Sequence, residues 1–228
     1  MTCTTEFDGE LGRIRGLTWL PWIGSAYLQK KVLALGESHY CYDNKTTSEI
    51  ENCLEETRGT VEDYVERGRE AGDQWRTYEP MEAVLRNSIF AEEDRNALWS
   101  QLAFMNLIQS CMGDRHARPH WELFLNGWPV VLQVIHILRP EICICFCTDK
   151  RLNRVNFNRL EEFKPKLDFD CSIEPNEDTP ERISRCIVAR PGQIRIGDEY
   201  RCPVIFVRHP SHGGRSTEWA EIIRRYAL

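Results

Sequence analysis

The stretch KVLALGESHYCYD, Lys31 to Asp43, decides the class of fold. Its first half, Lys31 to Gly36, predicts a buried β-strand, because a short run of β-capable apolar residues ends at a turn glycine. Directly after the glycine come a glutamate, a serine, a histidine and a tyrosine. A buried strand that runs straight into polar side chains is typical of α/β proteins, whose ligands bind at the carboxyl ends of strands.

Further strand-like and helix-like segments alternate along the rest of the chain. Apolar runs predict strands ending near Asn106, in PEICICFCT, in RCIVAR and in CPVIFVRH. Amphipathic spacing predicts helices in EEDRNALWSQ, HWELFLNGWPVVLQVIHILRP and STEWAEIIRRYA. This alternation predicts an α/β fold, a three-layer α/β/α sandwich with a largely parallel, four-stranded central sheet.

The segment from Thr47 to Gly72 is acidic and helix-prone. We expect a helical insertion at about 47–72, built as a solvated pair of helices with a break at Gly59. The chain has 228 residues, which suits one compact domain. The expected organisation is therefore a single domain over residues 1–228 that carries this insertion.

Composition restricts the classes of function. The net charge of −6 disfavours a protein that grips nucleic acid non-specifically over a wide surface, because such binding depends on neutralising phosphates. No apolar stretch approaches the roughly 20 residues of a membrane helix, and the first ten residues lack the pattern of a secretory leader. We therefore expect a cytoplasmic protein with no membrane partner. Basic residues still cluster locally, in DRHARPH and in VRHPSHGGRS.

The ten cysteines include no C-x-x-C pair, and in a cytosolic chain of this length they indicate reduced thiols. Cys143, Cys145 and Cys147 alternate in ICICFC and so share one face of a strand. Three thiolates in register are able to hold a metal, but small apolar thiols are also common core residues. The second interpretation is favoured, and no metal site is predicted.

Four segments in order resemble the motifs of the uracil-DNA glycosylase superfamily. They are LALGESHY, FMNLIQSCMGDRHARPHWELF, VVLQVIHILRPEICICF and VIFVRHPSHGGRS. The resemblance implies the sandwich fold of that superfamily and hydrolysis of the N-glycosidic bond of uracil, or of a related damaged base, in DNA, including single-stranded DNA. It implies no cofactor, because Cys3, Cys41, Cys53 and Cys111 do not follow the paired spacing of the branches that carry an iron-sulfur cluster.

The resemblance also implies roles for individual residues. Glu37 would stabilise the cationic sugar or position water, Asp43 would assist it or hold the loop, and His209 would donate a hydrogen bond to the departing base. Asn106 would read the edge of the base, with Tyr40 against the ring and Ser38 next to it. Phosphate contacts are expected at Ser211, Gly213, Gly214, Arg215 and Arg118.

The chain also departs from the family pattern. Ser38 stands where the best-known branch has its water-activating aspartate, and no apolar wedge follows His-Pro-Ser, because His212, Gly213, Gly214 and Arg215 occupy that place. These departures leave two alternatives open. One is a superfamily member that binds a nucleotide or single-stranded nucleic acid without cleaving it. The other is a hydrolase acting on free nucleosides or nucleotides.

Overall fold

The computed structural model describes residues 3–41, 45–72, 75–91, 93–113, 119–148, 167, 169–175, 181–183, 186–208 and 216–226. Its helices are α1 (Asp8–Leu11), α2 (Thr47–Glu51), α3 (Glu56–Arg67), α4 (Trp75–Ser88), α5 (Arg95–Ser100), α6 (Trp121–Leu138) and α7 (Ser216–Tyr226), with 3₁₀ turns η1 (Tyr27–Gln29) and η2 (Gly68–Glu70). Its strands are β1 (Trp22–Ile23), β2 (Val32–Gly36), β3 (Leu102–Asn106), β4 (Ile142–Thr148), β5 (Cys171–Pro175), β6 (Glu181–Ile183), β7 (Cys186–Ile196) and β8 (Tyr200–Arg208).

The strands form one eight-stranded sheet in the order β1-β3-β2-β4-β8-β7-β5, with β6 paired to β7. Strands β3, β2, β4 and β8 are parallel to one another. Strands β1, β5, β6 and β7 join through antiparallel pairs. The α/β class is confirmed, whereas the prediction of a four-stranded, largely parallel sheet is wrong, because antiparallel strands extend both sides of the parallel group.

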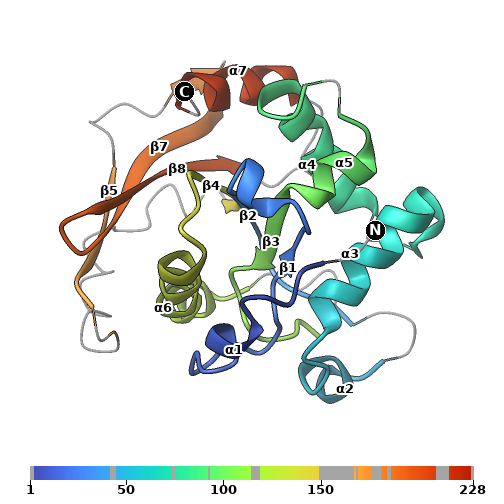
Figure 1. Ribbon diagram of the computed structural model, residues 1–228. Coiled ribbons are helices and arrows are strands. Elements are labelled where there is room, and N and C mark those ends of the chain that lie inside the picture. Colours follow the sequence, from blue (N-terminus) through green and yellow to red (C-terminus); the bar gives the residue numbers. More distant parts are fainter. Residues whose placement is uncertain are drawn as a thin grey trace.

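The largest departure from the predicted sheet is the long hairpin of β7 and β8 (Figure 1). Gly197, with a φ of +60°, lies in the turn between the two strands, a backbone conformation that favours glycine. The described residues of the predicted strands RCIVAR and CPVIFVRH, 186–190 and 202–208, are parts of these two longer strands, which run antiparallel. A hairpin turn is short enough to pair two neighbouring strands directly, so no crossover helix separates them.

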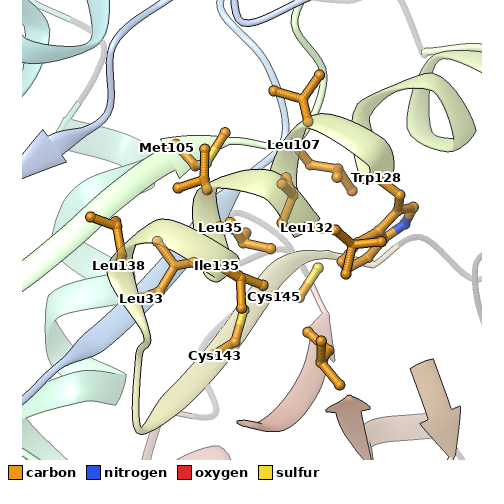
Figure 2. Packing of buried hydrophobic residues seen from close by; sticks show 14 of the residues in the cluster. Leu33, Leu35, Met105, Leu107, Trp128, Leu132, Ile135, Leu138, Cys143 and Cys145 are labelled. Atoms are coloured by element: carbon orange, nitrogen blue, oxygen red, sulfur yellow. The ribbon is translucent and has the colours of Figure 1, made fainter. Parts of the chain in front are cut away.

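Strand β2 is buried on both faces, and its side chains alternate between two cores. Leu33 and Leu35 pack in the core on the α6 side, and Val32 and Ala34 pack in the core that contains residues of α3, α4, α5 and α7. Figure 2 shows Leu132, Ile135 and Leu138 of α6 lying over the face of β2 that carries Leu33 and Leu35. Helices on both faces of the sheet make a three-layer arrangement.

Two of the three alternating cysteines of β4 are core residues. Cys143 and Cys145 are buried in the core on the α6 side, where Figure 2 shows them against the helix. Burial raises the pKa of the Cys143 thiol well above its ordinary value. Such a thiol stays protonated and acts as a small apolar side chain, which confirms the core interpretation for these two residues. The side chain of Cys147 lies outside the described residues.

The acidic segment forms two helices, α2 and α3, but their boundary differs from the prediction. Helix α3 runs through Gly59 without a break, and the chain turns instead between Glu51 and Glu56. A capping box between Thr46 and Glu49 begins α2. One face of α3 is buried in the core that it shares with α4, α5 and α7. The expectation of a solvated pair of helices is therefore wrong for this face.

Helix α6 is, within the described ranges, the one helix long and apolar enough to cross a membrane. Most of that apolar stretch is buried inside the protein. Its apolar face covers the parallel strands, as expected for the crossover helix that connects β3 to β4.

Helix α6 and the end of β3 are in direct backbone contact at Gly127. A Cβ built on Gly127 would overlap the carbonyl oxygen of Leu107 and lie 2.9 Å from its carbonyl carbon. Both atoms belong to the backbone, so neither can move aside without displacing the strand end. Glycine at this position therefore sets how closely α6 approaches the residue that follows Asn106.

We predict that Gly127→Ala destabilises the protein by roughly 1 to 3 kcal/mol, because overpacking outweighs the gain in helix propensity of about 1 kcal/mol. Gly59→Ala in α3 is the matched control, because a Cβ there meets nothing within 4 Å. We expect this variant to gain roughly 0.5 to 1 kcal/mol. Urea unfolding of the wild type and the two variants measures both changes in the free energy of unfolding. An equal gain in stability in the two variants would contradict the close contact between Gly127 and Leu107.

Candidate functional site

The candidate site lies at the carboxyl ends of the parallel strands. The connections reverse direction at β2, since β3 lies on one side of it and β4, the next of the parallel strands along the chain, lies on the other. In open α/β sheets, ligands bind outside the strand ends at such a reversal. Gly36 and Asn106, the last residues of β2 and β3, are register partners. The segment GESHY therefore begins directly beside Asn106.

Hydrogen bonds hold the two segments together beyond the sheet. The amide of Leu107 donates to the carbonyl of Gly36, and the amide of Ile108 donates to the carbonyl of Glu37, both at 2.9 Å. Further on, Met112 and His39 are joined at 2.8 Å, and Cys41 and Met112 at 3.0 Å. The loop from Glu37 to Cys41 is thus fixed against the chain that follows Asn106.

Asn106 has a buried side chain, with 5% of the residue exposed. Its Oδ1 lies so close to Gly36 that a Cβ on the glycine would overlap it, and the same Cβ would lie 2.8 Å from Cζ of Phe104. A carboxamide at this position offers one kind of donor and one kind of acceptor to a ligand at the strand ends.

Glu37 is half-buried, and its carboxylate is oriented by Tyr40. The phenol of Tyr40 donates a hydrogen bond of 2.5 Å to Oε1 of Glu37. The sequence-based role of Tyr40 was to contact the ring of a base. The structure adds a second role, because the same side chain restricts the rotamers open to the predicted catalytic carboxylate.

Ser38 and His39 anchor the loop to neighbouring segments of the chain. The hydroxyl of Ser38 donates to the carbonyl of Ser110 at 2.6 Å. Nε2 of His39 lies 2.8 Å from the hydroxyl of Thr57 in α3, and the Trp19 ring meets the imidazole edge-on at 4.7 Å. Burial lowers the pKa of His39 to about 4, so the ring is neutral at pH 7. The buried, neutral ring therefore serves to hold the loop against α3.

Several predicted site residues lie outside the described residues. They are Asp43, Arg118, His209, Ser211, Gly213, Gly214 and Arg215. Strand β8, which leads to His209, is parallel to β4 at the same edge of the sheet. The structure therefore brings together Glu37, Ser38, Tyr40 and Asn106, and the roles of these four residues, like those of the other seven, stay predictions.

The site also contains residues that sequence reasoning did not single out. Nε2 of Gln109 donates to the carbonyl of Asn106 at 2.6 Å, and its Oε1 accepts from the amide of Thr18 at 3.0 Å. The sulfur atoms of Cys41 and Cys111 lie 3.7 Å apart between the two paired segments. Neither feature has a sequence signal, because each depends on segments far apart in the chain.

A separate groove of about 590 Å³ runs along α3, between Lys45 and Gly72. Lys45 forms an ion pair with Glu56, and Arg67 forms one with Asp63. The groove is therefore lined by charges that already have partners, and neither Glu37 nor Asn106 lines it. Among the described residues, no group of three or more His, Cys, Asp or Glu side chains could hold a metal ion.

Comparison with known proteins adds no relative. No protein-family model matches the chain. No curated protein matches it either. The resemblance to uracil-DNA glycosylases therefore stays a prediction from the sequence motifs.

We predict that His39 makes the protein less stable in acid. Its pKa is about 4 in the folded protein and about 6.5 in an unfolded chain, so between these values the unfolded state binds more protons. The free energy of unfolding should therefore fall by up to ~3 kcal/mol as the pH is lowered through this window. In His39→Gln, which can still bond to Thr57, this part of the pH dependence should be absent. Urea unfolding at several pH values compares the slopes, and parallel slopes would contradict the assignment.

Proposed function

We propose that this protein is a DNA glycosylase that hydrolyses the N-glycosidic bond of uracil, or of a related damaged base, in DNA. The observation that carries the proposal is the pairing of a carboxylate with the carboxamide of a buried asparagine at adjacent strand ends. Glu37 follows β2 directly, and Asn106 ends β3 in register with Gly36. This arrangement supports a site that reads a base on one side and stabilises a sugar on the other.

The chemistry divides between these two groups. When the bond between C1′ and the base nitrogen breaks, its electron pair leaves with the base, and positive charge develops on the sugar. A carboxylate near the sugar stabilises that charge, and water then adds to C1′. Glu37, oriented by the hydroxyl of Tyr40, is suited to this role.

Recognition of the base falls to Asn106. A carboxamide offers one donor and one acceptor, which match a carbonyl oxygen and the imide N–H of uracil. The Oδ1 of Asn106 lies beside the Cα of Gly36, at the point where β2 ends. His209, by the resemblance, would donate to a base carbonyl and stabilise the departing anion.

In this proposal, β3, β2, β4 and β8 are the four-stranded parallel sheet of a uracil-DNA glycosylase-like sandwich. Strands β1, β5, β6 and β7 are additions to it. The partner is DNA, including single-stranded DNA, in the cytoplasm. Asp43 assists Glu37, and Ser211, Gly213, Gly214, Arg215 and Arg118 bind phosphate.

We expect the protein to release uracil from a single-stranded oligonucleotide with one uracil, at low salt. Single strands remove the cost of flipping the base out of a duplex. Glu37→Gln should slow release roughly 100-fold or more, because it removes the charge next to the sugar. Asn106→Ala should abolish detectable release. Exposed Glu62→Gln in α3 is the matched control and should behave as the wild type.

Circular dichroism and thermal unfolding separate these roles from a role in the core, because the variants should remain folded. If enzyme in excess releases no base but the oligonucleotide binds and Asn106→Ala weakens the binding, the protein is a binding module rather than an enzyme. Release of uracil from a free mononucleotide would instead identify a nucleotide hydrolase. Neither outcome is compatible with the proposed function.

A further inference from the structure

Helix α6 extends beyond the strand ends where the candidate site lies. It returns the chain from the end of β3 to the start of the parallel strand β4, so it runs antiparallel to both. Its Gly127 contacts Leu107, the residue directly after β3. Trp121, six residues before Gly127, lies about 9 Å further along the helix axis, given the rise of 1.5 Å per residue. The first two turns of α6 therefore overhang the edge of the sheet that carries Glu37 and Asn106.

Trp121 is unusual among the tryptophans whose side chains the structure describes. It is 43% exposed, whereas Trp19, Trp22, Trp99, Trp128 and Trp219 are each exposed by 4% or less. The ring of His120 lies 6.0 Å from it, at an angle of 46°. The side chain of His120 is also exposed. Two neighbouring rings are thus partly exposed at the start of α6.

We propose that Trp121, with His120 beside it, forms a platform on which a base of single-stranded DNA stacks next to the base that enters the site. This role rests on the proposed function, because it places the strand across the ends of β2 and β3. Stacking on an aromatic side chain contributes substantially to binding of single strands and tolerates any base. The bases of a duplex are already stacked on one another, so an exposed indole finds a free face only on an unpaired base.

The charge of the protein favours stacking as a source of affinity. With a net charge of −6, attraction of the whole surface for phosphate is weak, so a strand needs local contacts. The sequence just before Trp121, RHARPH, is basic. A protein partner fits less well, because the other large apolar residues that are exposed in the described part of the chain, Leu28 and Leu54, belong to η1 and to the turn between α2 and α3. Interfaces between proteins usually need a contiguous apolar patch.

The test is the affinity for a fluorescein-labelled strand of ten thymidines without uracil, measured by anisotropy at a fixed low salt concentration. Trp121→Ala should weaken binding roughly tenfold, and Trp121→Phe should retain most of it, because the ring is preserved. Leu54→Ala removes an exposed apolar side chain elsewhere and should bind as the wild type. Binding should also quench tryptophan emission in the wild type and quench it less in Trp121→Phe.

Unchanged binding by Trp121→Ala would overturn the platform, as would an equal loss in Leu54→Ala. If Trp121→Ala weakened binding of a matched duplex by the same factor as binding of the single strand, the preference for unpaired bases would be overturned. The probe contains no uracil, so the outcome does not depend on base release. A protein that binds through Trp121 but releases no uracil would disprove the glycosylase and keep the platform, and the reverse pattern would disprove the platform alone.

Discussion

Strand β2 is hydrogen-bonded to a parallel strand on each side and buried on both faces, and the rest of the structure depends on this constraint. A strand in that position cannot shift by one residue, because every side chain would then move into the opposite core. Its register with β3 places Gly36 opposite Asn106. The position of the polar residues after Gly36 is therefore set by packing far from the site.

Beyond the sheet, hydrogen bonds continue that register into the loops. The carbonyls of Gly36 and Glu37 accept from the chain after Asn106, and the buried ring of His39 joins the loop to α3. Tyr40 holds the carboxylate of Glu37, so this group is oriented without a ligand. Groups preorganised around developing charge are those that lower a reaction barrier most. The same rigidity would serve a binding module equally well.

Local pattern predicted β2, α5 with β3, α6 and β4 because each has a continuous apolar run or a helical period next to a clear stop. It did not predict the hairpin of β7 and β8, where Gly197 supplies a turn with a positive φ, because its two apolar runs read equally well as parallel strands. It also placed a break at Gly59, although the face of α3 that includes Val61 and Tyr64 is buried and keeps the helix continuous. Tertiary packing outweighs the low helix propensity of one glycine.

The sequence by itself determined the α/β class and the polar residues that follow each buried strand, because those features depend on neighbours in the chain. Only the tertiary structure decided which of them meet. Asn106 and Glu37 are far apart in sequence, and their juxtaposition follows from the pairing of β2 with β3. The same holds for the exposure of Trp121, which depends on how far α6 extends past its contact with Leu107. Contacts between distant segments are selected by the packing of whole elements, which no local pattern encodes.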